Sequence, residues 1–141
     1  MIKRIFIILI CFSLTIPGYA GNGDKLAQIS MQINAMEKAC QSCIDAGSYN
    51  FISCETTFYK QMDSLLNDIY KQLSFQMDSA QFEKLKIDQR AWLKKRDAYA
   101  KNKDTEIGSS GAGVETDQAL AIHQKALFEK ERVIELLKAL K

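Results

Sequence analysis

Apolar residues recur every three or four positions through most of the chain after residue 20, which is the spacing of amphipathic helices. A first helix is expected to follow Asp24, its N-cap, and to end at Gly47. A second is expected from residue 51 to about residue 77. The apolar positions are Leu26, Ile29, Ile33, Met36, Cys40 and Cys43 in the first helix, and Phe51, Cys54, Phe58, Met62, Leu65, Leu66, Ile69 and Leu73 in the second.

The third helix has a start signal of its own. Asp78 followed by Gln81 has the spacing of a capping box, and the helical pattern then continues to about Asn102. One face of this helix carries four apolar or aromatic residues and two strong hydrogen-bonding groups. In chain order this face consists of Phe82, Leu85, Gln89, Trp92, Arg96 and Tyr99.

Polar groups on a buried face need partners on a neighbouring helix. Asp63, Asn67 and Tyr70 share one face of the second helix and can supply them. We therefore expect an interhelical polar cluster, which either fixes the packing register of the helices or binds a partner. The members expected from this pairing are Asp63, Asn67, Tyr70, Gln89, Trp92, Arg96 and Asp97.

Residues 103–113 have no apolar periodicity and are rich in Gly and Ser, so they are expected to form an irregular loop. Residues 108–113 should be its most mobile part, serving either as a contact loop or as a plain connection. A fourth helix opens at Glu115 or Thr116. Its apolar stripe consists of Leu120, Leu127, Ile134 and Leu137, widened by Val133, Leu136 and Leu140.

These patterns define the expected fold class. No stretch shows the alternation of apolar and polar residues that is typical of a strand, and no internal repeat is present. The single Pro lies within residues 1–20. The chain is therefore expected to be all-α, with about four antiparallel helices in a compact bundle.

Residues 1–20 are expected to be a secretory signal peptide rather than part of the bundle. A basic start, an apolar run too short to span a bilayer and the small residues Gly18 and Ala20 fit cleavage after Ala20. Cys11 raises a lipoprotein alternative, but Ile10 stands where such a signal needs a small residue. The domain would then cover residues 21–141 of a periplasmic or secreted protein with no membrane attachment after cleavage.

Charge argues against nucleic acid as a partner. Residues 1–20 hold two of the 19 basic residues and none of the 17 acidic ones, so the rest of the chain is formally neutral. Residues 83–103 carry eight basic and three acidic residues, whereas the segments before and after are net acidic. A phosphate-binding protein would need a net positive surface, and solvated faces explain this distribution more simply.

Three cysteines follow residue 20, and an oxidising compartment favours one disulfide among them. Cys54 is expected to pair with Cys40 or with Cys43, and either bridge joins the first helix to the second. The remaining thiol would be buried, giving a monomer, or would link two chains.

No motif indicates catalysis, a metal or a cofactor. Cys40 and Cys43 have CxxC spacing, but at a helix C-terminus, where the helix dipole raises rather than lowers a thiol pKa. His123 is the only histidine, and a zinc site built from it and the three cysteines has no supporting spacing. We therefore expect a non-enzymatic protein without cofactors.

The central residues resemble the LprI-type lysozyme inhibitor family over roughly residues 40–140. The resemblance rests on Cys54, Asp63, Leu66, Asn67, Tyr70, Leu85, Gln89, Arg90, Trp92, Leu93, Arg96 and Asp97, with Arg132, Glu135 and Leu136 fitting a later Arg-x-x-Glu-Leu pattern. It implies a small secreted or periplasmic helical protein, and it adds Arg132 to the polar cluster. Similar proteins have cysteines where this chain has Ala100 and Gln124, and a threonine where it has Glu129.

The resemblance implies inhibition of lysozyme or of another peptidoglycan-cleaving enzyme as the expected function. The partner is expected to contact the loop at residues 104–116, through Glu106, Ser109, Ser110 and Glu115. The alternatives are an immunity-type protein that neutralises a secreted toxin and a structural envelope protein.

Overall fold

The computed structural model describes residues 22–47 and 50–140, and four helices account for most of them. They are α1 (Asn22–Asp45), α2 (Phe51–Gln76), α3 (Ser79–Thr105) and α4 (Val114–Leu137). No strand occurs among the described residues. The prediction of an all-α bundle of about four helices is confirmed.

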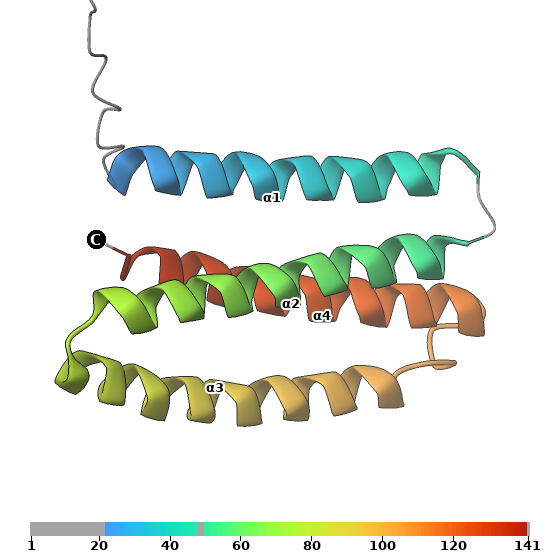
Figure 1. Cartoon of the computed structure of the whole chain (residues 1–141). Coiled ribbons are helices and arrows are strands. Elements are labelled where there is room, and N and C mark those ends of the chain that lie inside the picture. Colours follow the sequence, from blue (N-terminus) through green and yellow to red (C-terminus); the bar gives the residue numbers. More distant parts are fainter. Residues whose placement is uncertain (1–21, 48–49, 141) are drawn as a thin grey trace, which may run out of the picture.

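Helices that follow one another in the chain run antiparallel, whereas α2 and α4 run in the same direction (Figure 1). The most extensive packing joins this parallel pair, with α1 packed on α2 and α3 packed on α4. The C-terminus of α1, the N-terminus of α2 and the loop at residues 106–113 lie at the same end of the bundle (Figure 1).

The core is built around α2. Phe58, Met62, Ile69 and Leu73 are at most 1% exposed, as the period of the second helix predicts. On α4, Ala126 and Val133, which lie about two turns apart on the same face, are completely buried. Small side chains at this contact let two helices approach closely, so α4 follows α2 along its length.

The predicted apolar stripe of α4 is wrong in part. Leu120, Leu127 and Ile134 are 51%, 36% and 39% exposed and lie on the outer face of the helix, whereas the predicted residues Val133, Leu136 and Leu137 are buried. The sequence pattern placed these three residues on the core face because they are large, apolar and spaced seven residues apart. The true core face also contains small alanines and two charged residues, Glu129 and Arg132.

The capping box at the start of α3 is present. The Asp78 carboxylate accepts a hydrogen bond from the Gln81 backbone N–H at 2.8 Å, and the Gln81 side chain accepts one from the Asp78 N–H at 3.4 Å. The helix extends to Thr105, three residues beyond the predicted end. The following helix begins at Val114, slightly before the predicted start.

The disulfide joins Cys43 to Cys54, with their Cα atoms 5.9 Å apart, and resolves the two pairings that the sequence allowed. It links the end of α1 to the first turn of α2. Cys40 is a buried free thiol. Burial, reinforced by the charge of Glu55 and a hydrogen bond to it, raises the pKa of this thiol to about 11.

The proposed signal peptide and cleavage site lie outside the described residues. Within the part that the structure describes, no helix is long and apolar enough to cross a membrane.

Candidate functional site

The predicted polar cluster is divided between two arginines. Arg132 on α4 is the buried one, with its side chain 7% exposed. It donates to Gln89 Oε1 through Nε at 2.9 Å and Nη2 at 2.8 Å, and to Glu135 at 2.9 Å. A further ion pair joins it to Asp88. Arg132 and Gln89 thus connect α4 to α3.

Arg96 was expected to be the buried arginine, but its side chain is 28% exposed. Its guanidinium lies 3.8 Å from Asp63 on α2 and 3.6 Å from Glu129 on α4, and it also pairs with its neighbour Asp97. The structure therefore brings Asp63 and Arg96 together across the helices, as the pairing of the two stretches anticipated. It also adds Glu129, which that pairing did not include.

Trp92 connects the two arginines. The guanidinium carbons of Arg96 and Arg132 each lie 5.7 Å from the centre of its ring, within the range of a cation–π interaction. Phe128 on α4 stacks against the indole with ring centroids 5.8 Å apart. The Trp92 side chain is 8% exposed, so it combines a core position with two polar neighbours.

The remaining predicted members have more local roles. Asn67 donates to the backbone oxygen and the carboxylate of Asp63, both on its own helix. Tyr70 packs against Phe82 with ring centroids 5.6 Å apart. None of the described hydrogen bonds joins Asn67 or Tyr70 directly to Gln89.

Sequence reasoning missed Glu129. This side chain is completely buried, and neither carboxylate oxygen has a partner at regular hydrogen-bond geometry. Burial, together with the nearby charge of Asp63, raises its pKa to about 7, while Arg96 and the Tyr59 hydroxyl oppose the rise. The burial of Glu129 could have been predicted from its spacing, because Ala126, Glu129 and Val133 share one helical face.

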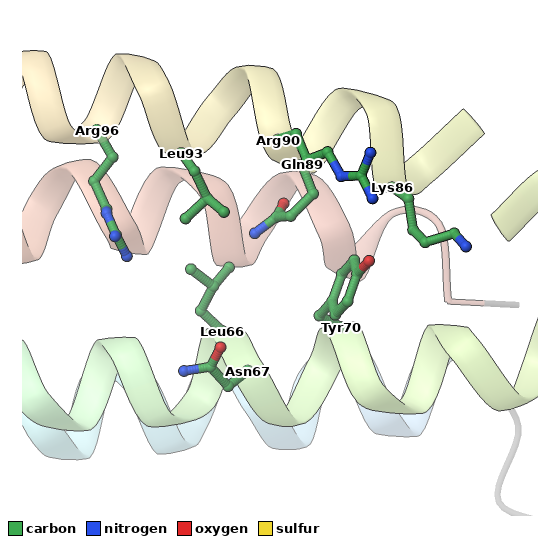
Figure 2. A pocket seen from close by; sticks show the side chains of 8 residues that line it. All are labelled: Leu66, Asn67, Tyr70, Lys86, Gln89, Arg90, Leu93 and Arg96. Atoms are coloured by element: carbon green, nitrogen blue, oxygen red, sulfur yellow. The ribbon is translucent and has the colours of Figure 1, made fainter. Parts of the chain in front are cut away.

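A hollow of about 240 Å³ lies between α2 and α3, beside this cluster (Figure 2). These two helices have little direct backbone contact, because α4 packs against both of them. We call this hollow the α2/α3 groove. Its lining residues are Leu66, Asn67, Tyr70, Lys86, Gln89, Arg90, Leu93 and Arg96.

The second candidate surface is the loop at residues 106–113, which Asp117 on α4 holds in place. The Asp117 carboxylate accepts hydrogen bonds from the Gly108 N–H at 2.8 Å, the Ser110 N–H at 3.4 Å and the Ser110 hydroxyl. These bonds hold the Asp117 pKa below its ordinary value, and the bond from the Ser110 hydroxyl has a larger effect than the two backbone bonds. The loop therefore has a defined internal network.

Of the four predicted contact residues, Glu106, Ser109 and Glu115 are exposed on or beside this loop. Ser110 is also exposed, but its hydroxyl serves the internal network. Glu106 pairs with Lys103 at 2.8 Å, so its charge is partly compensated. Glu106, Ser109 and Ser110, but not Glu115, line a hollow of about 220 Å³ that reaches Leu120 and Gln124.

His123 belongs to a polar contact between helices. Its Nδ1 lies 2.9 Å from the Glu55 carboxylate, and its ring stacks on Phe58 with centroids 6.1 Å apart. The Glu55 carboxylate also accepts a hydrogen bond from the Cys40 thiol, so it lies between that thiol and the His123 imidazole. No group of three His, Cys, Asp or Glu side chains within the described ranges could hold a metal ion.

Comparison with known families matches residues 40–136 to the family described as lysozyme inhibitor LprI. The match covers more than half of the chain. This protein belongs to the LprI family. The matched segment includes both arginines of the polar cluster, the α2/α3 groove, the loop and both cysteines of the disulfide. No curated protein and no solved structure matches the chain.

Proposed function

We propose that this LprI-family protein is a periplasmic or secreted inhibitor of lysozyme or of another peptidoglycan-cleaving enzyme. The observation that carries the proposal is the family match over residues 40–136. Residues 1–20 have the pattern of a secretory signal peptide, which fits the compartment where such enzymes act.

In this proposal the enzyme contacts the end of the bundle where α3 and α4 meet. The loop at residues 106–113 is exposed, and the Asp117 network holds its backbone. A loop that is ordered before binding loses less conformational entropy when a partner docks on it. Glu106, Ser109 and Glu115 are exposed on or beside the loop, where an enzyme can reach them.

Charge supports this choice of surface. Lysozymes are often strongly basic, and the segment at residues 104–141 carries seven acidic and five basic residues. Glu115 is exposed and makes no ion pair among the described residues, so it is available to a basic enzyme. Opposite charges on two partners raise the association rate and help to orient them.

The chain's own groups support binding rather than catalysis. A cysteine nucleophile needs a lowered pKa, whereas burial and Glu55 raise that of Cys40. The His123 imidazole lies against Glu55 rather than next to a hydroxyl or thiol nucleophile. A blocking protein needs neither group to react.

The surface is tested by neutralising two of its charges. The double variant Glu106→Gln and Glu115→Gln should raise the inhibition constant against a chicken-type lysozyme by about tenfold. The control, Asp68→Asn with Glu131→Gln, removes the same charge from exposed positions away from the loop. Equal inhibition by both variants would exclude the loop contact, and no inhibition by the unmodified protein would exclude this lysozyme as the target.

A further inference from the structure

One side of α4 carries three large apolar side chains that none of the described helices covers. Leu120, Leu127 and Ile134 are 51%, 36% and 39% exposed, although a bundle helix normally turns such residues toward the core. They are spaced seven residues apart, so they form a row about 21 Å long on one side of the helix. We call this row the outer α4 stripe.

The outer α4 stripe faces away from α2. Leu127 lies about 160° around the helix from Glu129, which is buried next to Tyr59 of α2. On one flank of the stripe, Phe128 stacks against aromatic rings of α3. On the other flank, Lys130 pairs with α1. The stripe therefore runs along α4 between its contacts with the other helices and is open to a further helix.

The polar residues on the same side of α4 are charged only in its C-terminal half. Thr116 and Gln124, toward the N-terminal end, carry no charge, whereas Glu131 and the C-cap residue Lys138 do. Both charged side chains are exposed, and neither makes an ion pair among the described residues. The way in which these charges meet decides how two copies of the surface can pair.

A parallel arrangement of two α4 helices is disfavoured by these charges. It would place each residue opposite its own copy, so Glu131 would meet Glu131 and Lys138 would meet Lys138. Like charges that face each other at a contact destabilise it. An antiparallel arrangement centred on Leu127 instead brings Glu131 opposite Gln124 of the second copy, whose amide can donate to the carboxylate. Lys138 then lies opposite the uncharged Thr116.

The apolar residues fit the same antiparallel arrangement. Leu127 lies on the two-fold axis and packs against its own copy, and Leu120 packs against Ile134 of the second copy, twice by symmetry. A shift of seven residues in either direction would leave one large apolar residue of each copy without a partner. The register centred on Leu127 therefore covers the whole outer α4 stripe.

We propose that the outer α4 stripe binds a second copy of this chain and forms a two-fold symmetric dimer with antiparallel α4 helices. A second copy is favoured over an unrelated helix because this surface matches its own reversed order, apolar against apolar and amide against carboxylate. One helix from each copy buries less than the roughly 1,600 Å² of a standard interface, so we expect a dissociation constant of about 100 μM. The inference does not depend on inhibition through the loop.

Sedimentation equilibrium of the oxidised protein, from about 10 μM to about 1 mM, measures the association. We expect a monomer–dimer equilibrium. Leu127→Glu places two carboxylates on the axis and should weaken association about tenfold or more. The control Ile87→Glu makes the same kind of change on α3, at a side chain that is 67% exposed, and should leave association unchanged. Neither position is in the core, so thermal melts should show a folded bundle for both variants.

Introduced cysteines test the orientation of the two helices. Leu127→Cys should form a covalent dimer under mild oxidation, because this residue meets its own copy. A mixture of the Leu120→Cys and Ile134→Cys proteins should form the mixed dimer, whereas Leu120→Cys alone should not link to itself. Cys40 is buried, so the introduced thiol is the one that reacts. A monomer at every concentration, equal weakening by Leu127→Glu and Ile87→Glu, or self-linking of Leu120→Cys would overturn the proposal.

Discussion

The Arg96 guanidinium lies 3.6 Å from the carboxylate of Glu129, which is completely buried and has no regular hydrogen bond. Asp63 lies 3.8 Å from the same guanidinium. With Asp97, which also pairs with Arg96, three carboxylates share one cation, and Glu129 is the one that has no access to water. Burial makes the ionised form of Glu129 costly, and the pKa of about 7 expresses that cost.

Glu129 should make the stability of the protein fall as the pH rises through neutrality. The pKa rises from 4.5 in the ordinary state to about 7 in the fold, so the folded protein retains a proton that the unfolded chain releases. Stability from this group is complete below pH 4.5 and is lost as the pH passes 7. Urea unfolding followed by Trp92 fluorescence should show a loss of roughly 2 kcal/mol between pH 5 and pH 8.

The matched variant for this effect is Glu129→Gln, which has almost the same shape and no charge. It should be more stable than the unmodified protein at pH 8 and should have a flatter pH profile. The groups facing Glu129 are Tyr59 and Asp63 on α2 and Arg96 on α3, and all three remain. An unchanged pH profile would show that Glu129 is not the titrating group.

Replacing Arg132 should test the buried connection between α3 and α4. Arg132→Ala removes both bonds to Gln89 and the cation beside Trp92, so we expect it to lower the free energy of unfolding by about 3 kcal/mol. Arg132→Lys should recover only part of this because an ammonium cannot make the same forked contact. Denaturant melts of the two variants give these values, and a loss well under 1 kcal/mol for Arg132→Ala would contradict the assignment.

The three cysteines should respond differently to substitution. Cys43→Ser opens the loop closed by the Cys43–Cys54 bridge and should cost about 3 kcal/mol on the chain-entropy model. Cys40→Ser keeps the bridge and should cost less. In the native state iodoacetamide should fail to label Cys40, because the thiol is buried and its pKa is about 11. Rapid native labelling followed by mass analysis would contradict this placement.

Asp117 should control the order of the loop at residues 106–113. In Asp117→Asn the amide cannot accept all the bonds that the carboxylate receives, so the amide protons of Gly108 and Ser110 should exchange faster with solvent. The Asp117 pKa is lowered from its ordinary 3.8, so the stabilisation is present above that pH and is lost as the pH falls through the lower value. Hydrogen exchange measured by NMR gives both results, and unchanged protection in the variant would contradict the network.

Local signals in the sequence predicted much of this fold. The capping box of Asp78 and Gln81 marked the start of α3, and the spacing from Phe82 to Tyr99 identified its inward face, on which Trp92 is buried and the other residues are half-buried. Such signals depend on residues within one or two turns of each other. They are therefore readable without knowledge of the packing.

The remaining features depend on contacts between distant segments. The α4 stripe was placed on Leu120 and Leu127 because large apolar residues normally mark a core face, whereas close packing on α2 requires small residues such as Ala126. The charged groups around the buried Glu129 carboxylate, Arg96 and Asp63, come from two other helices. Helix periodicity does not contain that information.

A titration of muramidase activity tests whether the protein inhibits a peptidoglycan-cleaving enzyme. Purified, oxidised protein is added in increasing amounts to a fixed concentration of chicken-type lysozyme acting on bacterial cell walls. We expect a stoichiometric fall in activity that ends near one equivalent. Full activity at a large molar excess, with the Cys43–Cys54 bridge intact, would contradict inhibition of this lysozyme.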